Sequence, residues 1–182
     1  MRKVILGAGL SVDGYIARPN GSVDFLAAPE DYSMEDLFSS VDVVLFGRKT
    51  FDAAQHLGGA PQGAWTMYVF SRSQPPGKRS GVVFVNDSPA DFIARLRRDP
   101  GKDIFHMGGG ELARAFLQAD LIDELHLDIV PLLLGEGIPL FPAGFPQRDF
   151  RLIENKTYSG GFISIKYERV RASTTPPNRG KV

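Results

Sequence analysis

The sequence contains no cysteine, and this absence excludes several kinds of chemistry. A chain without cysteine has no disulfide, no thiolate metal ligand and no cysteine nucleophile. Its three histidines, His56, His106 and His126, are too dispersed to form the HExxH pair of a zinc enzyme. We therefore exclude thiol and zinc catalysis from the expected functions.

The sequence also lacks an excess of charge of one sign and a long apolar run. The 21 Lys and Arg residues balance the 21 Asp and Glu residues, so no net field would attract nucleic acid or an anionic membrane. The apolar segment near the N-terminus is too short for a secretory signal or a membrane span. We expect a cytoplasmic protein that binds neither nucleic acid nor a membrane.

The composition that is present suits one globular domain. The chain has 182 residues, of which 43% are hydrophobic and 23% are charged, and this is enough apolar surface for one core. We expect a single domain over residues 1–170. Residues 171–182 are polar and contain two prolines, which predicts a flexible tail.

Strand-like and helix-like segments alternate over the first two thirds of the chain. Apolar runs predict strands at 4–10, 41–46, 65–70, 82–85 and 103–107, and helical spacing predicts helices that begin near Ser33, Thr50, Pro89 and Gly110. Ser33 and Asp36 suggest a capping box, and Gly58-Gly59 should end the second helix. Ser88 followed by Pro89 predicts the start of the third.

The pattern changes after residue 124. Residues 125–130, 150–158 and 162–170 alternate apolar and polar residues as half-buried strands do, and the last two segments predict a hairpin. Residues 131–142 are apolar but too rich in Gly and Pro for regular structure. We predict a three-layer α/β fold, with a mainly parallel central sheet, an antiparallel C-terminal hairpin and helices on both faces.

A run of three glycines, Gly108–Gly110, lies where a strand passes into a helix. Bare backbone and the free N–H groups of a helix start can hold a phosphate there. Residues 108–113 also fit a dinucleotide fingerprint, with Asp128 near the distance of a ribose-binding acid, but the later elements do not fit a Rossmann sheet. The simpler alternative is that the glycines only let the helix pack on the strand.

A second strand-to-helix turn, Gly47–Thr50, adds the cations Arg48 and Lys49, and Arg72 follows the next strand. In a parallel sheet these turns lie at the same edge, where open α/β folds bind ligands. The alternative is that the three cations are solvated surface charges. Gly7 and Gly9 inside the first strand further suggest that another molecule approaches its backbone.

Five segments stand in the order seen in the dihydrofolate reductase-like superfamily. They are residues 11–17 (SVDGYIA), 47–51 (GRKTF), 70–73 (FSRS), 107–112 (MGGGEL) and 130–141 (VPLLLGEGIPLF). The chain resembles most the branch that contains the reductase domain of bifunctional riboflavin-biosynthesis enzymes. The resemblance extends to about residue 170.

This resemblance implies an NADPH-dependent reductase that forms a homodimer. The cofactor-binding residues that it implies are Ala8, Gly9, Ile16, Gly21, Gly47, Arg48, Lys49, Thr50, Ser71, Arg72, Met107, Gly108, Gly109, Gly110, Glu111 and Leu112. By the same resemblance, Arg48 and Arg72 lie beside the adenosine 2′-phosphate and the backbone of Ala8 and Gly9 meets the nicotinamide. A loop that includes Ile16, Asn20 and Gly21 closes over it.

The catalytic acid is the point of departure from dihydrofolate reductases proper, which carry a carboxylate at the start of the first helix. The candidates here are Asp24, Glu30 and Asp31, and we favour Asp24. The lack of an unambiguous counterpart argues against folate as the natural substrate. Asp13 and Phe25 are candidate substrate-binding residues, although Asp13 could simply shape its turn and Phe25 could simply pack.

We therefore expect hydride transfer from NADPH to a small heteroaromatic or carbonyl substrate that resembles a pterin or pyrimidine. Two alternatives remain: a stand-alone 5-amino-6-ribosylaminopyrimidine reductase of riboflavin biosynthesis, and a non-catalytic nucleotide-binding module. The apolar segments 132–134 and 138–141 could be core or a dimer face.

Overall fold

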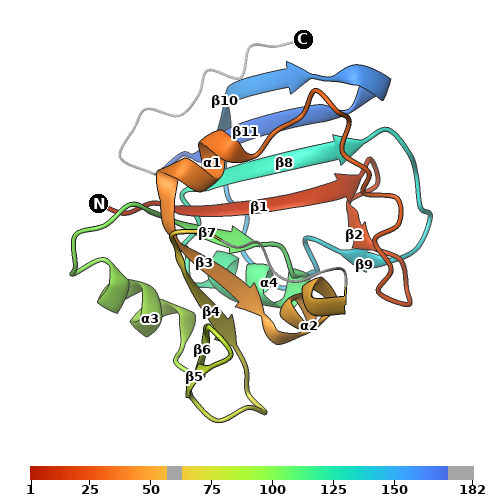
Figure 1. Ribbon diagram of the computed structural model, residues 1–182. Helices are drawn as coiled ribbons and strands as arrows, with labels where there is room; N and C mark the ends of the chain where they lie inside the picture. The colour runs from red at the N-terminus through yellow and green to blue at the C-terminus, as the bar shows by residue number, and fades with distance from the viewer. Residues whose placement is uncertain (57–62, 172–182) are drawn as a thin grey trace.

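The computed structural model describes residues 1–56 and 63–171, and one large sheet forms its centre (Figure 1). The strands of this sheet are β1 (Val4–Ser11), β3 (Val41–Gly47), β4 (Thr66–Phe70), β5 (Gly77–Arg79), β6 (Val82–Val85), β7 (Asp103–Met107), β8 (Glu124–Val130), β10 (Phe150–Thr157) and β11 (Ile163–Arg169). Their order is β10-β11-β8-β1-β7-β3-β4-β6-β5. A short second sheet pairs β2 (Tyr15–Ala17) with β9 (Ile138–Pro139).

The direction of the strands confirms the predicted architecture. Strands β8, β1, β7, β3, β4 and β6 run parallel, so their carboxyl ends meet at one edge of the sheet. The hairpin β10–β11 is antiparallel and joins the sheet beside β8, as the alternating pattern after residue 124 predicted. The edge strand β5 is also antiparallel to its neighbour.

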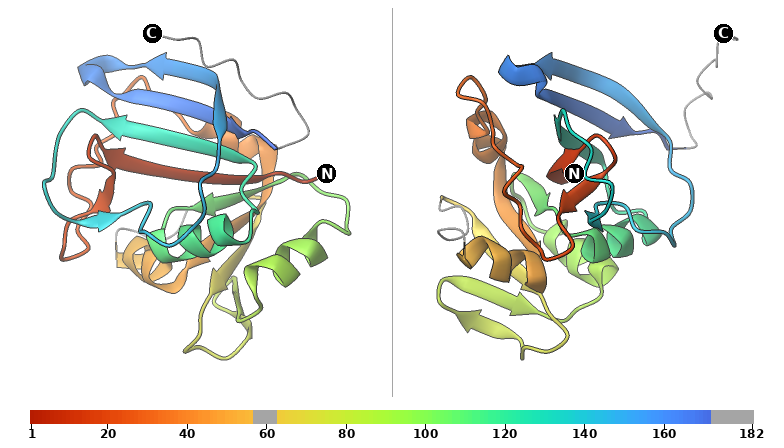
Figure 2. Two further views of the ribbon diagram at one scale, coloured as in Figure 1. Left: turned by 180° about the vertical axis from the view of Figure 1, so that it is seen from behind. Right: turned by 90° about the vertical axis from the view of Figure 1, so that its right-hand side faces the viewer.

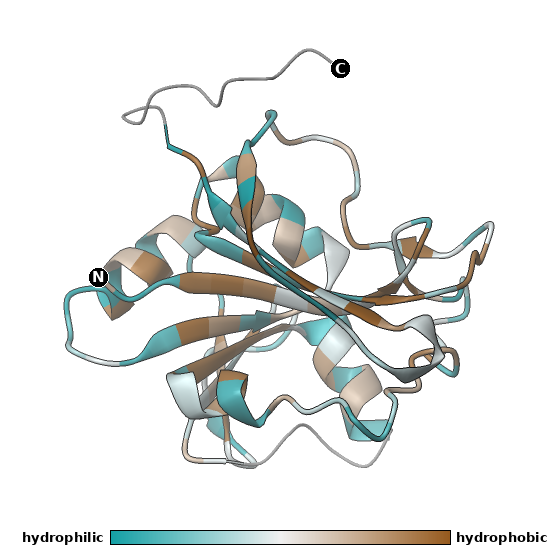
Figure 3. Ribbon diagram, turned by 90° about the horizontal axis from the view of Figure 1, so that it is seen from above, coloured by the Kyte–Doolittle hydropathy of each residue, from teal (hydrophilic) through white to brown (hydrophobic). Residues whose placement is uncertain are grey.

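Helices cover both faces of the sheet, so the fold has three layers. Helices α1 (Glu35–Ser40) and α2 (Arg48–His56) lie on one face, and α3 (Pro89–Leu96) and α4 (Gly110–Gln118) lie on the other (Figures 1 and 2). Successive side chains of a buried strand enter opposite cores: Val44 packs beneath α1 and α2, whereas Leu45 packs beneath α3 and α4. Figure 3 shows the resulting apolar centres of the strands.

The cover is incomplete beyond β1. Viewed from behind, β8, β11 and β10 have no described helix over them (Figure 2). On that side they present apolar side chains, and Leu152 of β10 is 48% exposed. Among the described helices, none has the length and apolar character needed to cross a membrane.

Three local predictions need correction. Helix α1 begins at Glu35 after Met34 and has no side-chain cap, so the capping box at Ser33 and Asp36 is wrong; Ser33 Oγ accepts only from the Glu35 N–H, at 3.1 Å. The space above Gly7 is filled by the ring of Phe105, so packing explains this glycine rather than a ligand. The prediction also missed β2, β5 and β9, each of which has only two or three residues.

Other local predictions fare better or lie outside the description. Ser88 Oγ accepts a hydrogen bond from the Asp91 N–H at 3.1 Å and caps α3, as predicted. The predicted end of the second helix at Gly58-Gly59 and nearly all of the predicted tail lie outside the described residues.

Candidate functional site

The two predicted glycine turns lie against each other at the carboxyl edge of the sheet. Gly47 ends β3, and a Cβ atom added to it would lie 3.6 Å from Leu112 Cβ in α4. A Cβ atom on Gly109 would lie 2.7 Å from Thr50 Oγ1 in α2. Folding therefore brings the turn at 47–50 and the turn at 108–112 together, although about 60 residues separate them in the chain.

The backbone of the triple-glycine turn requires glycine. Gly108 and Gly109 have φ angles of +51° and +84°, which side chains rarely adopt. The Gly108 N–H donates to the Gly7 carbonyl at 2.9 Å, so the turn is tied to the middle of β1. Helix α4 starts at Gly110, and the N–H groups of its first turn have no partner within the helix. The turn can therefore present donors to an anion.

Gly110 serves packing as well. A Cβ atom here would lie 2.3 Å from the Pro139 carbonyl oxygen and 3.1 Å from Pro142 Cδ. The irregular segment 131–142 thus presses its backbone on the start of α4, and its Leu140 is fully buried. The alternative that the glycines serve only packing therefore holds for Gly110. Gly108 and Gly109 instead shape the turn.

The predicted cations border the two turns on the solvent side. Arg48 forms an ion pair with Asp52 at 2.7 Å within α2, and both side chains are more than one third exposed. Lys49 and Arg72 are exposed. Ser71 is buried, and its Oγ accepts from the Gln74 N–H at 3.0 Å, which shapes the turn that carries Arg72.

Some of the remaining predicted cofactor residues pack against the two cores, and one lies on the surface. Met107 packs with the core under α1 and α2, and Ala8, Ile16 and Leu112 pack with the core under α3 and α4. Glu111 is exposed and pairs with Arg114 at 2.9 Å.

Leu26 covers the backbone of Gly9. A Cβ atom on Gly9 would lie 3.2 Å from Leu26 Cδ2, so this loop side chain occupies the place where the resemblance expected a ring to approach. The same loop includes Asn20, whose Oδ1 accepts from the Ser22 N–H at 2.9 Å, and Gly21, which has a φ angle of +87°. These contacts shape the turn that returns the chain toward β1.

The structure gives the predicted acid and substrate residues other surroundings. Asp24 is 59% exposed and pairs with Arg18 at 2.7 Å, and the hydrogen bond from Arg18 lowers the pKa of Asp24. Both oxygens of Asp13 are used, because Oδ1 accepts from Ser11 Oγ at 2.6 Å and Oδ2 accepts from the Gly135 N–H at 2.8 Å. Asp13 therefore shapes its turn. Phe25 is buried within the loop.

A polar surface lies beside Gly9, and it includes Asp128, which the sequence suggested only as a ribose-binding acid of a dinucleotide fingerprint. In register, Gly9 faces Asp128 of β8, and Asp128 faces Ser164 of β11. Tyr32, just before α1, donates from its hydroxyl to Asp128 Oδ2 at 2.5 Å. Burial and the neighbouring Asp128 raise the pKa of Tyr32, so its hydroxyl stays protonated. The alternation of β8 placed Asp128 in a strand, but only the pairing with β1 shows that it lies beside Gly9.

Further from the carboxyl edge, the same surface carries an ionic cluster. His126 Nε2 lies 2.9 Å from Glu124 Oε2, and Lys3 Nζ donates to Glu124 Oε1 at 2.6 Å. The hydrogen bond with His126 and then that from Lys3 lower the pKa of Glu124 to about 2, against the effect of burial. Lys166 of β11 pairs with Glu154 of β10 at 3.2 Å. Charge on this surface is therefore locally balanced.

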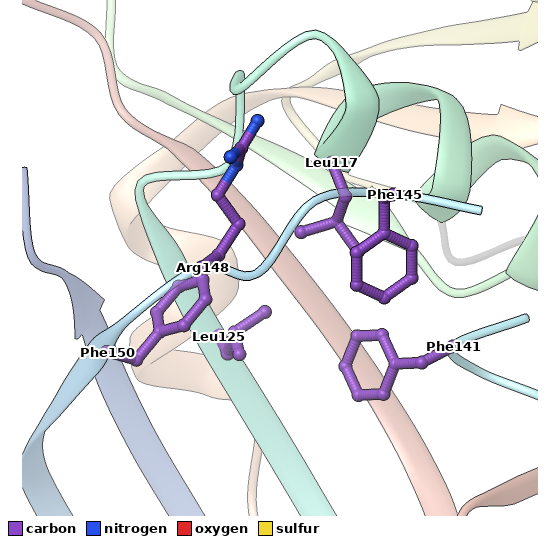
Figure 4. Close-up of a pocket in the computed structure, with 6 residues that line it drawn as sticks. All are labelled: Leu117, Leu125, Phe141, Phe145, Arg148 and Phe150. Carbon is purple, nitrogen blue, oxygen red and sulfur yellow. The ribbon is translucent and has the colours of Figure 1, made fainter. Parts of the chain in front are cut away.

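A cavity of about 280 Å³ lies on the other side of the sheet, near the end of α4 (Figure 4). It is lined by Leu117, Leu125, Phe141, Phe145, Arg148 and Phe150. The guanidinium of Arg148 points away from the rings in Figure 4 and lies 3.1 Å from Asp120. The cavity is therefore apolar and separate from the glycine turns.

Comparison with known proteins agrees with this geometry. The family model of the RibD C-terminal domain matches residues 2–164. The chain is 33% identical to the uncharacterized protein YyaP of Bacillus subtilis, over 91% of this chain and 94% of YyaP. It is 28% identical to a Shewanella sp. PV-4 protein provisionally assigned to riboflavin biosynthesis, with a TM-score of 0.82 and coverage of 93% and 99%.

A more distant solved structure has the same fold. The deaminase/5-amino-6-(5-phosphoribosylamino)uracil reductase of Thermotoga maritima matches with a TM-score of 0.70 at 13% identity, over 93% of this chain and 57% of that one. The fold is therefore that of the RibD-type reductases, as the resemblance implied. The chain belongs to the RibD C-terminal domain family.

Proposed function

We propose that this protein is an NADPH-dependent reductase of a small heterocyclic substrate that resembles a pyrimidine or pterin. The observation that carries the proposal is the contact between the Gly47–Thr50 turn and the Gly108–Leu112 turn. Two helix starts at one sheet edge offer two sets of free N–H donors, which suits a cofactor with more than one phosphate.

The residues at this edge fit such a cofactor. Gly108 and Gly109 have no side chain to cover the backbone, and Thr50 Oγ1 lies 2.7 Å from where a Cβ on Gly109 would be. In the proposal these turns hold the phosphates, and Arg48 and Arg72 lie beside the 2′-phosphate. NADPH supplies the hydride when it is bound.

The chain itself would orient the reactants and keep water out. Gly9 provides a flat backbone surface at the end of β1, and Leu26 provides an apolar cover above it. A ligand that reaches this surface must displace Leu26, so the loop must move before a ring can lie on Gly9. The same side chain can then exclude water from the pair of reactants.

The relatives support this class of reaction. The names of the Shewanella and Thermotoga proteins refer to riboflavin biosynthesis and to reduction of a phosphoribosylaminouracil. The membership of the RibD C-terminal domain family points the same way. These relations favour, as the second and more specific candidate, reduction of 5-amino-6-(5-phosphoribosylamino)uracil.

The cofactor assignment can be tested by binding. NADPH should raise the melting temperature, or change the fluorescence of the single tryptophan, Trp65, more than NADH does at equal concentration. Equal responses, or none, would reject the assignment. Oxidation of NADPH with the uracil substrate would favour the specific candidate, whereas binding without turnover on any carbonyl, pterin or pyrimidine would favour a non-catalytic module.

We also propose a homodimer, as the resemblance implies. The support is the apolar side of β8 and β11, where Leu127, Ile129, Ile165 and Tyr167 are only half-buried and no described helix covers them. Light scattering should give twice the chain mass of 19.9 kDa. Substituting Leu152→Lys at the margin of this surface should shift the protein toward the monomer, and a monomeric parent would contradict the proposal.

A further inference from the structure

Asp128 is the carboxylate that lies beside the proposed reaction surface. Neighbouring strands of a sheet point paired residues to the same side, so the pairs Gly9–Asp128 and Asp128–Ser164 form one row across β1, β8 and β11. Leu26 covers Gly9 in this row. A planar ring that replaced Leu26 on Gly9 would therefore have Asp128 at its side, one strand away.

Asp128 is held but not saturated. Tyr32 donates to Oδ2 at 2.5 Å, whereas Oδ1 accepts no hydrogen bond from any described residue. The side chain is half-buried, and its Oδ1 is available to accept a hydrogen bond from a ligand. Ligand N–H groups are suitable donors, since a charged acceptor strengthens such bonds.

Tyr32 is fixed in turn by the hairpin. Its ring makes edge-on contacts with Tyr158 and Phe162, at centroid distances of 5.4 Å and 5.0 Å. The neighbouring Asp31 accepts from Ser159 Oγ at 2.9 Å. The two ring contacts hold the Tyr32 hydroxyl against Oδ2, whereas the Asp31–Ser159 bond anchors only the loop.

Three other carboxylates near the loop are already committed, and the candidate acid Glu30 is exposed to solvent. Asp24 is paired with Arg18 in solvent, Asp13 accepts from Ser11 and from the Gly135 N–H, and Asp31 binds Ser159. Asp128 differs because its one hydrogen-bond partner among the described residues is the neutral hydroxyl of Tyr32 rather than a cation.

We propose that Asp128 is the substrate-orienting carboxylate of this site and that Tyr32 positions it. The inference rests on the proposed reductase function. Oδ1 accepts an N–H group of the heterocyclic substrate, and Tyr32 prevents the carboxylate from turning away. Asp128 thus takes the place that the sequence assigned to Asp24.

The key variant is Asp128→Asn, because an amide oxygen can still accept from Tyr32 while the charge is lost. NADPH oxidation is followed with 5-amino-6-(5-phosphoribosylamino)uracil and with dihydrofolate, using the substrate that the parent reduces faster. We expect kcat/KM to fall about 10- to 100-fold, the range of a hydrogen bond to a charged group, chiefly through KM. The NADPH Kd and the Tm should match those of the parent.

Two further variants separate orientation from simple anchoring of the loop. Tyr32→Phe keeps the charge and loses the hydroxyl, so KM should rise about 5-fold with kcat almost unchanged, as for one neutral hydrogen bond. Ser159→Ala is the matched control, because it loosens the same loop through Asp31 without touching Asp128. Its kcat/KM should stay within about twofold of the parent.

The outcomes are distinguishable. Parent-like kinetics of Asp128→Asn, with normal NADPH binding, would overturn the role of Asp128 and leave the reductase proposal standing. Equal losses of kcat/KM in Asp128→Asn and Ser159→Ala would show that Asp128 only anchors the loop. This result would also overturn its role in orienting the substrate. A parent that binds no NADPH, or oxidises it with neither substrate, would overturn the proposed function and this inference together.

Discussion

The two ends of the parallel strands are built from different chemistry. At the amino end, ion pairs with at least one buried partner join neighbouring elements: Arg2 pairs with Asp42, Arg97 pairs with Asp123 at 2.5 Å, and Lys3 pairs with Glu124 at 2.6 Å. At the carboxyl end, glycine turns and helix starts lie together, and the nearby cations face solvent.

This difference gives the two ends of the sheet different roles. Paired charges satisfy one another at the amino end, so that end has little left to offer a ligand. The bare backbone of the carboxyl end leaves donors free, which is useful only if a ligand accepts from them. Substitutions at the amino end should therefore affect stability alone, and those at the carboxyl end should affect binding as well.

The largest effect should come from Asp123→Ala at the amino end. Asp123 is buried and accepts from Arg97, from Arg171 and from the Val4 N–H at 2.8 Å, so its loss removes the acceptor of the buried Val4 N–H and the counter-ion of the largely buried Arg97. We expect the free energy of unfolding in urea to fall by about 3–5 kcal/mol.

The matched control for this substitution is Asp87→Ala. The Asp87–Arg95 pair lies in solvent at 3.2 Å, so its loss should cost at most about 1 kcal/mol. The shift in Tm caused by NADPH should persist in a folded Asp123→Ala variant. An equal loss of unfolding free energy in both variants, or loss of the NADPH-induced Tm shift in Asp123→Ala, would contradict the contrast between the two ends of the sheet.

The next effect should come from Gly110→Ala at the carboxyl end. The new Cβ atom would lie 2.3 Å from the Pro139 carbonyl oxygen, so backbone must move. We expect a loss of about 1–3 kcal/mol in stability, together with a weaker NADPH shift. For the neighbouring Gly47→Ala, the added atom makes an ordinary 3.6 Å contact, and stability should change by less than about 0.5 kcal/mol. Similar stability losses in both variants would contradict the steric argument.

A smaller effect concerns the core between the two ends. His106 is fully buried, and neither ring nitrogen has a hydrogen-bond partner. Burial lowers the pKa of His106 to about 3, so the ring is neutral in the folded state and can take up a proton only on unfolding. Stability from this residue is complete above about pH 6.5 and falls toward pH 3, by about 1.4 kcal/mol per pH unit.

Urea unfolding at pH 7 and pH 5 would measure this dependence. The parent should lose more stability on acidification than His106→Leu, which cannot titrate at that position. His56→Gln, at the end of α2, is the control and should follow the parent. An identical acid loss in the parent and His106→Leu would show that the buried ring makes no contribution.

The smallest effect should come from the exposed cations. Replacing both Arg48 and Arg72 by Ala should reduce the preference for NADPH over NADH about tenfold, as one lost charged hydrogen bond would. A double substitution of Arg95 and Arg98, which are exposed on or just after α3, removes the same charge and should leave the preference unchanged. If the variant without Arg48 and Arg72 prefers NADPH over NADH as strongly as the parent does, these two residues do not bind the 2′-phosphate.

The sequence predicted the features that have local causes better than those that depend on distant contacts. The Gly108–Gly110 turn and the Ser88 cap were predictable because their causes lie within a few residues. The layers and the parallel sheet followed from the alternation of elements. The contact between the two glycine turns needed only the additional rule that parallel strands end at one edge.

The polar surface beside Gly9, which includes Asp128 and Tyr32, was not predictable in this way. The contact between Tyr32 and Asp128 joins residues 96 positions apart and depends on the register of β8 against β1. No local pattern places Leu26 over Gly9, or shows that Asp24 lies in solvent. Side chains on a long loop take their places from distant partners, so the sequence alone could not show the surroundings of Asp24.

The anchoring of Asp31 by Ser159 has a consequence for biosynthesis. The two residues are 128 positions apart, so a ribosome must add most of the remaining chain before this contact can form. Until then, residues 18–34 emerge without their docking partner, and early folding must proceed around an unfastened segment. The loop to which we assign the substrate is therefore expected to be among the last segments to mature on a newly made polypeptide.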